Sequence, residues 1–328
     1  MKDFGFGSGG VGNATSSNYS LEATAGEQSA NKLDGSTYSI GTGLVYTNQA
    51  NVPVAPAVIN SSNWYNKLRI TLDTSGNPSD TLYAIAISTD NFTSDTQYVQ
   101  SDQTTGATLG LEDYQTYSSW GGGAGFLVIG LSPNTNYSFK VKAIQGKFTE
   151  TGYGPVANAS TLGATLTFDI DVSATDTETN PPFSTDLGTL TAGSVSTTTN
   201  KVWVDFDTNA ENGGRVYVVA SNTGLKSQNQ NYTIGAIAGN LTSSSEGFGI
   251  QGSTATQTSG GPFVLDAAYA LSSQNVGITD ATVRTLFSTS APVALGRGSF
   301  VLKAKSSNVT PAASDYQEIL TLIASANF

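Results

Sequence analysis

"GLSPNTNYSFKVKAIQ", residues 130–145, places a tight Ser-Pro-Asn turn before a run in which apolar side chains alternate with polar ones. Successive side chains of a β-strand point to opposite faces. One face of this run carries Tyr137, Phe139, Val141 and Ala143, and the other carries Ser138, Lys140, Lys142 and Ile144. The stretch therefore predicts a half-buried strand with a tyrosine at its entrance.

Similar short strand patterns recur along the chain. Ser, Thr, Gly and Asn interrupt nearly every 3.6-residue period, which excludes long helices and indicates an all-β protein. Short helices are expected only at residues 261–271 and 280–287. The terminal run "DYQEILTLIASANF", residues 315–328, is apolar on both faces, so it is predicted to be a central strand or one that pairs with a partner.

The 328 residues are enough for two tandem β-sandwich domains and an N-terminal extension. The first sandwich is expected at residues 51–163, where strand patterns are separated by turns such as "SGNPSD" and "SPNTN". The second is expected at residues 164–328, beginning with "ATLTFDIDVS". Residues 1–50 form the extension, with two related strand-like segments at 17–26 and 36–44 and too few large apolar residues for a core of their own.

The pattern Leu-Ser-Pro-Asn-Thr-x-Tyr-x-Phe-x-Val-x-Ala, from Leu131 to Ala143, resembles the corner between strands E and F of fibronectin type III domains. The resemblance covers about residues 52–161. It implies an immunoglobulin-like sandwich in which the Tyr137 hydroxyl bonds to upstream backbone. The sequence departs from the family in having no tryptophan on the expected second strand, "KLRITLD", residues 67–73. The order of segments resembles secreted bacterial surface proteins that contain such domains, which implies a structural role without catalytic residues.

The composition excludes several classes of function. The chain has no His and no Cys, and this removes imidazole bases, thiolate nucleophiles, disulfides and the usual zinc ligands. A net charge of −11 argues against nucleic acid and anionic membranes as partners. No apolar run reaches bilayer length, so membrane insertion is not expected. No carboxylate pair lies beside an aromatic-rich apolar segment as a glycosidase would require. We therefore expect a protein that is not an enzyme.

The best candidate for a metal site is "DFDTNAENGG", residues 205–214. Its oxygen ligands for calcium would be Asp205, Asp207, Asn209 and Glu211, which alternate as in a calcium-binding loop. Ala210 and Val216 depart from the EF-hand pattern. The alternative is a strand with exposed acidic residues that ends in an Asn-Gly-Gly hairpin turn. A weaker version of the same pattern contains Asp169, Asp171, Asp176 and Glu178.

Two classes of function remain. The first is a structural subunit of an extracellular filament, pilus-like fibre or surface layer, in which residues 1–50 pair head-to-tail with another copy by β-strand addition. The scarcity of charged and oxidisable side chains favours an extracellular or cell-surface location. The alternative is a monomeric adhesin or carbohydrate-binding module, in which Trp64, Tyr65 and Trp120 stack on glycans. A second interpretation is that these aromatic residues cover the end of a sandwich.

Overall fold

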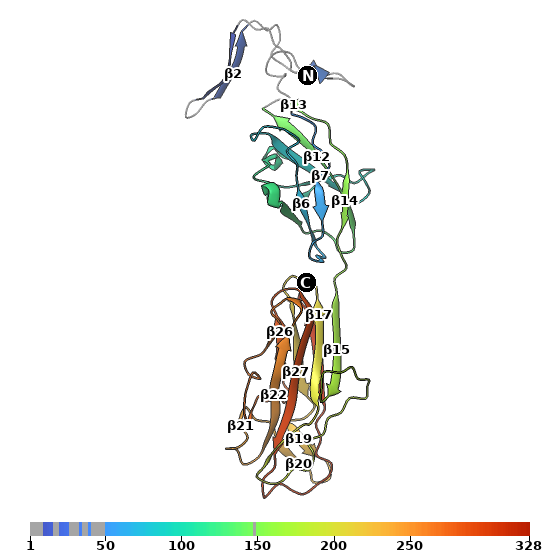
Figure 1. Ribbon diagram of the computed structural model, residues 1–328, viewed down its shortest axis with the longest axis vertical. Helices are drawn as coiled ribbons and strands as arrows, with labels where there is room; N and C mark the ends of the chain where they lie inside the picture. Colours follow the sequence, from blue (N-terminus) through green and yellow to red (C-terminus); the bar gives the residue numbers. More distant parts are fainter. Residues whose placement is uncertain (1–8, 16–19, 26–32, 35–38, 41–49, 147–148) are drawn as a thin grey trace. The chain divides into compact units, whose positions relative to one another are not determined.

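The computed structural model describes residues 9–15, 20–25, 33–34, 39–40, 50–146 and 149–328, and in this part of the chain the fold is all-β, as predicted (Figure 1). Helical structure among these residues is limited to two 3₁₀ turns, η2 (Leu111–Asp113) and η3 (Gly122–Ala124). None of the described helices is long and apolar enough to cross a membrane. The expected helices at 261–271 and 280–287 are wrong, because the first contains β24 (Val264–Leu265) and the second overlaps β26 (Arg284–Thr289).

The chain forms two compact units, Met1–Gly163 and Ala164–Phe328. The first unit begins with two strand pairs. β1 (Gly9–Thr15) is antiparallel to β2 (Ser20–Ala25), with a register shift between Val11 and Ala14. β3 (Leu33–Asp34) is antiparallel to β4 (Ser39–Ile40). β2 and β4 lie in the two segments whose sequences are related, while Tyr19 and Tyr38 lie outside the described residues.

Two further sheets make up the rest of the first unit. One has the order β11-β6-β5, and the other has β13-β12-β7-β8-β9, with β10 on β7 and β14 on β12. These strands are β5 (Ala57–Ile59), β6 (Lys67–Thr71), β7 (Leu82–Ser88), β8 (Gln97–Val99), β9 (Thr105–Gly106), β10 (Gln115–Thr116), β11 (Phe126–Ile129), β12 (Asn136–Gln145), β13 (Thr149–Glu150) and β14 (Ala157–Ser160). Both sheets contribute to one core, an arrangement consistent with a β-sandwich.

The strand β12 has the alternation that its sequence predicts. Tyr137, Phe139, Val141 and Ala143 are all buried in the core. Ser138, on the opposite face, is also buried, and its hydroxyl donates a hydrogen bond to Asn158 Oδ1 at 2.6 Å. The Tyr137 hydroxyl accepts a hydrogen bond from the Ser132 backbone N–H at 2.8 Å. This is the bond to upstream backbone that the resemblance implied.

The second unit also has two main sheets. The larger has the order β15-β17-β27-β16, with β22 and β23 on β27, and the smaller has the order β24-β26-β18-β28. The strands not yet given are β15 (Leu166–Ser173), β16 (Val195–Thr197), β17 (Lys201–Thr208), β18 (Gly214–Ala220), β19 (Gly224–Ser227), β20 (Tyr232–Gly235), β21 (Gly239–Asn240), β22 (Gly247–Thr256), β23 (Ser259–Gly260), β25 (Asn275–Val276), β27 (Val293–Lys305) and β28 (Leu320–Ala326).

The core of the second unit lies between these sheets. Val204 and Phe206 of β17 face inward, as do Val216 and Val218 of β18. Phe263 joins the two layers, because its ring stacks on Phe206 at 5.7 Å and on Phe287 of β26 at 5.2 Å between centroids. Even-numbered residues of β15 and β17 therefore point into the core. Their odd-numbered residues lie on the outer face of the larger sheet.

Candidate functional site

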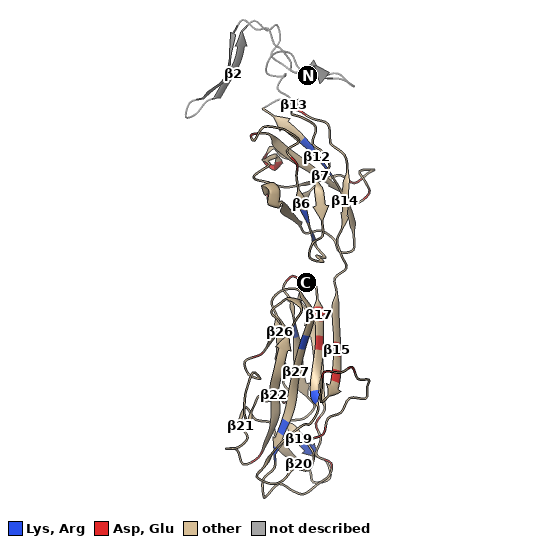
Figure 2. Cartoon of the chain, viewed as in Figure 1, with Lys and Arg blue, Asp and Glu red and all other residues tan. Residues whose placement is uncertain are grey.

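The two acidic stretches singled out in the sequence lie side by side on this outer face. β15 and β17 are antiparallel neighbours, and Asp169 lies directly opposite Asp205. Arg297 of β27 lies opposite Asp205 on its other side. Figure 2 shows acidic residues on β15 and β17 and a basic residue beside them on β27. The pairing of three strands thus assembles one charged row from residues far apart in the chain.

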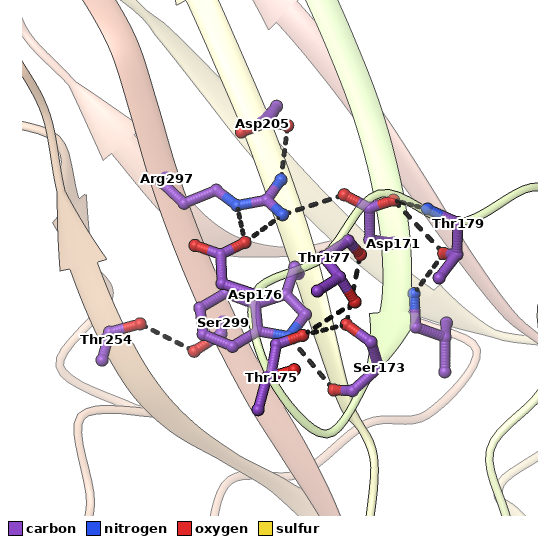
Figure 3. Close-up of polar contacts among 12 residues, drawn as sticks. Asp171, Ser173, Thr175, Asp176, Thr177, Thr179, Asp205, Thr254, Arg297 and Ser299 are labelled. Atoms are coloured by element: carbon purple, nitrogen blue, oxygen red, sulfur yellow. Dashed lines mark hydrogen bonds and ion pairs between the residues drawn. The ribbon is translucent and has the colours of Figure 1, made fainter.

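Arg297 lies at the centre of an acidic cluster (Figure 3). The oxygens of Asp169, Asp171 and Asp205 lie within 4.8 Å of one another, which is close enough for a shared cation. Arg297 Nη2 donates to Asp171 Oδ2 at 2.8 Å, and its Nε donates to Asp176 Oδ1 at 2.8 Å. Its Nη1 donates to Asp205 Oδ2. The guanidinium therefore supplies the positive charge that these carboxylates require.

A loop after β15 covers the cluster. The carboxylate Oδ1 of Asp171 accepts the Thr179 N–H at 2.6 Å, and the Thr179 hydroxyl accepts the Val172 N–H at 2.9 Å. Asp176, within the loop, is the residue that reaches Arg297. Trp203 lies beneath the loop, with Nε1 donating to Ser173 O at 3.1 Å and the Arg297 guanidinium carbon 5.5 Å from its ring centroid. These bonds hold the loop against the sheet.

The carboxyl groups of the cluster have pKa values shifted in opposite directions. Asp171 is fully buried. Its burial disfavours the charged form, but the hydrogen bonds from Arg297 and Thr179 outweigh burial and lower the pKa of Asp171 below its ordinary value. The negative charges of Asp171 and Asp169 raise the pKa of the nearby Glu178 carboxyl. Asp171 and Arg297 thus form a buried ion pair, and removing either partner would leave an uncompensated charge.

The predicted calcium set, Asp205, Asp207, Asn209 and Glu211, is not brought together as one group. Among the described residues, Asp205 groups with Asp169 and Asp171, and neither Asp207 nor Glu211 belongs to that group. Asp207 accepts the Leu295 N–H at 3.2 Å, and Asn209 Oδ1 accepts the Thr165 N–H at 2.8 Å. Glu211 is exposed in the turn after β17. The structure instead joins Asp205 to the members of the weaker pattern.

The alternative interpretation of this stretch is right about the strand, since β17 carries Asp205 and Asp207 on its outer face, and wrong about the hairpin. β17 belongs to the larger sheet and β18 to the smaller one, so the turn at residues 209–213 carries the chain from one sheet to the other. Gly213 makes this crossing possible. It has φ +67°, and a Cβ there would lie 2.2 Å from the Thr289 carbonyl oxygen.

Trp120, one of the aromatic residues expected to stack on glycans, is buried in the core of the first unit. It is 2% exposed, its Nε1 donates to Tyr83 O at 2.9 Å, and its ring centroid lies 4.6 Å from that of Phe126. A sugar has no access to this ring, so that assignment is wrong for Trp120. Trp64 is half-buried, with Lys67 Nζ 5.7 Å from its ring centroid. The large aromatic side chain missing from "KLRITLD" is thus supplied by a different segment.

Sequence reasoning missed a cluster of lysines and aromatic rings on the other face of β12. Lys140 Nζ lies 3.7 Å from the ring centroid of Phe92 and 4.7 Å from that of Tyr153. Lys142 forms an ion pair with Glu150 at 2.8 Å. Burial, together with the charge of Glu150, raises the pKa of Tyr114, whose hydroxyl donates to Glu150. The alternation of Lys140 and Lys142 was visible, but their partners come from the loop at Phe92, from the neighbouring strand β13 and from the segment after it at Tyr153.

A cavity of about 1150 Å³ lies in the second unit. It opens between the inner faces of the two sheets, and its walls include Ile170 and Val172 on β15 and Leu320 and Leu322 on β28. Residues 183–192, which form no strand, also line it. We call this feature the inter-sheet groove. Its lining is mixed, because polar residues such as Ser184, Asp186 and Glu318 lie beside these apolar side chains.

Comparison with known proteins gives no family assignment. No protein-family model matches the chain, and no curated protein matches it. Among solved structures, chitinase ChiA74 from Bacillus thuringiensis is similar at 10% identity and TM-score 0.19, over 82% of this chain and 29% of that one. The alpha-L-rhamnosidase from Dictyoglumus thermophilum is similar at 12% identity and TM-score 0.23, over 85% of this chain and 28% of that one. The chain thus spans less than a third of either protein, and TM-scores this low establish no shared fold.

Proposed function

We propose that this protein is a non-enzymatic structural subunit of an extracellular filament, pilus-like fibre or surface layer. Residues 51–163 and 164–328 would be two tandem sandwich domains of immunoglobulin or fibronectin III type. Residues 1–50 would be an extension that pairs with a neighbouring copy by β-strand addition. The absence of cysteine and histidine is compatible with this role and with an extracellular location.

The observation that carries the proposal is the pairing of the N-terminal strands. Among the residues that the structure describes, β1 pairs with β2, and β3 pairs with β4, each in a two-stranded sheet. A two-stranded antiparallel sheet is marginally stable in water, and three or more strands are needed for independent stability. Pairing with the sheet of another copy would supply the missing strands.

The most prominent cluster of charged side chains is compatible with a structural role. Asp171 and Arg297 are committed to each other and to the loop over Trp203. Such a cluster braces a sheet rather than presenting a free acid and base to a substrate. The proposal therefore assigns these residues to the stability of each subunit.

The test is negative-stain electron microscopy with light scattering on the full chain and on a chain lacking residues 1–49. We expect fibres or sheets of repeating subunits from the full chain and single particles from the truncated chain. Circular dichroism and a cooperative thermal transition would show whether the truncated chain is folded. Fibres from a folded truncated chain would contradict the role of the extension.

The alternative function is a monomeric adhesin or carbohydrate-binding module. Half-buried Trp64 and Tyr65 are the remaining aromatic candidates from the sequence analysis, since Trp120 is enclosed. A full chain that stays monomeric at all concentrations would favour this alternative. Glycan-array binding that is lost in Trp64→Ala, but kept in a matched Tyr217→Ala control in the other unit, would then support it.

A further inference from the structure

The C-terminal strand β28 is an unprotected sheet edge. Across residues 164–328, all of which the structure describes, β28 pairs with β18 along its full length and with no other strand. The sequence predicted either a central strand or one that pairs with a partner. Within one chain β28 is not central. On its outer side Ile323 is 42% exposed, and Ile319, directly before the strand, is 64% exposed.

The hydrogen-bonding directions show which backbone groups are available. Ser221 N–H donates to Ile319 O, and Asn327 N–H donates to Gly213 O, both bonds across the β18–β28 pair. Antiparallel ladders alternate, so the odd-numbered residues of β28 bond to β18. The N–H and C=O groups of Leu320, Leu322, Ala324 and Ala326 therefore point away from β18, toward the open edge.

Nothing on β28 blocks the addition of a strand. Natural sheets protect their edges with charged residues, proline, bulges or covering loops. Residues 320–327, "LTLIASAN", contain no charge and no proline, and the register with β18 has no shift. β15, at the corresponding edge of the other sheet, is protected, because the Thr179 hydroxyl caps the Val172 N–H and Asp169 and Asp171 lie on its face.

The inter-sheet groove lies along this edge. The inward side chains of Leu320, Leu322 and Ala324 are only half-buried, whereas Val216 and Val218 on neighbouring β18 are buried. The core is thus incomplete at β28. A strand added beside β28 would send alternate side chains into the groove and the others outward.

We propose that the β28 edge and the inter-sheet groove accept strand β2 of a second copy. This inference rests on the proposed function and names its acceptor site. Residues 19–25, "YSLEATA", alternate apolar Tyr19, Leu21, Ala23 and Ala25 with polar residues, as a strand with one buried face requires. β2 has six residues and β28 has seven, so their lengths match.

Of the two strands in the β1–β2 pair, β2 is the better suited to add to the β28 edge. The irregularity in the β1–β2 pairing lies where β1 has one extra residue between Val11 and Ala14, so β1 has the less regular backbone. β2 can keep its pairing with β1 while its other edge bonds to β28. The smaller sheet of one copy would then be extended by a two-stranded ribbon of the next. The donor and acceptor are different surfaces, so the contact repeats head-to-tail as an open fibre.

Cysteine cross-linking tests this assignment directly, because the chain has no cysteine of its own. A Leu21→Cys chain is mixed with an equal amount of a Leu322→Cys or an Ala324→Cys chain, so that a mixed disulfide can form only between copies. Leu111→Cys, at a position 87% exposed in the first unit, is the accessible control acceptor. The mixtures are oxidised mildly and examined by non-reducing gel electrophoresis and electron microscopy.

We expect at least tenfold more mixed dimer with a β28 cysteine than with Leu111→Cys, in samples that also form fibres. Fibres without preferential cross-linking at β28 would overturn the acceptor site and leave the proposed function standing. Single particles without cross-links in any mixture would overturn both. Preferential cross-linking without fibres would support the acceptor site and overturn the fibre.

A second variant acts on the edge itself. Ala324→Pro removes an N–H that points to the open edge while leaving the bonds between β18 and β28 in place. Ala324→Ser keeps that N–H and is the matched control. We expect at least a tenfold loss of fibre mass in Ala324→Pro alone, with the thermal transition unchanged in both variants. Normal fibres from a folded Ala324→Pro chain would overturn the acceptor site. If that variant does not fold, the cross-linking result decides.

Discussion

Arg297 Nη2 lies 2.8 Å from Oδ2 of Asp171, although the two residues are 126 positions apart in the chain. The Asp171 carboxylate is fully buried. The pair joins β27 to β15 across the intervening strand β17, and Asp176 adds the covering loop to the same guanidinium. The stability of the second unit therefore depends on a charge pair at its outer face.

Removing Arg297 should destabilise the second unit strongly. Arg297→Met leaves the buried Asp171 without its cation, and breaking a buried ion pair in this way costs about 3–5 kcal/mol. Arg284→Met is the control, because Arg284 and Asp280 form a more exposed pair at 2.9 Å, worth about 1 kcal/mol or less. Urea unfolding of both variants measures the difference. Equal small losses would contradict the structural role of the cluster.

Acid should remove the contribution of Asp171. Its folded pKa lies below the ordinary value of 3.8, so its ion pair stabilises the folded state above that pH and loses this effect as pH falls through the folded pKa. We expect the difference in unfolding free energy between the unchanged chain and Asp171→Asn to be constant from pH 5 to 8 and to shrink in acid below about pH 4.

Urea titrations of the two chains from pH 8 to pH 2 would measure this difference. The chain contains no histidine or cysteine, so no side chain with an ordinary pKa between 5 and 8 confuses the plateau. A difference that persists unchanged at pH 2 would show that Asp171 contributes by packing alone.

Tyr137→Phe should weaken the first unit by about 1–2 kcal/mol. The substitution keeps the ring in the core but leaves the Ser132 N–H without the hydroxyl that accepts it at 2.8 Å. Tyr117→Phe is a control in the same unit, because the hydroxyl of Tyr117 makes no hydrogen bond among the described residues. Denaturant unfolding followed by circular dichroism compares the two. A Tyr137→Phe chain as stable as the control would mean that the corner bond is not important.

Gly213→Ala should destabilise the crossing between the two sheets of the second unit. The new methyl would clash with the Thr289 carbonyl oxygen in addition to occupying the left-handed region. Gly188→Ala is a matched control, since Gly188 has the same φ of +67° with nothing within 4 Å of the added Cβ. We expect about 1 kcal/mol for the control and at least about 2 kcal/mol more for Gly213→Ala. Thermal and urea unfolding of the two variants measure the loss of unfolding free energy. Equal losses would mean that the backbone shifts to relieve the clash at Gly213→Ala.

Local pattern alone determined where many strands lie. β12 follows the alternation of Tyr137, Phe139 and Val141, and β6, β7, β11, β15 and β17 follow similar runs. This succeeds because strand periodicity depends only on neighbours two positions apart. It failed at residues 280–287, part of which is strand β26. A short apolar segment suits either structure, and here pairing with β18 decided.

The candidate site needed the tertiary structure. Sequence reasoning found both acidic stretches but assigned them to separate calcium patterns and did not consider Arg297, because the sequence does not reveal which strands are neighbours. For the same reason the sequence left open whether Trp120 stacks on glycans or covers the end of a sandwich, and the structure encloses it in the core. The sequence by itself determined where the strands lie, which of their faces are apolar, and that histidine and cysteine chemistry is not available. Strand pairing decided which charges meet, which ring is enclosed and which edge is left open, since those depend on contacts between distant residues, 37 positions apart for Trp120 and Tyr83 and 126 for Asp171 and Arg297.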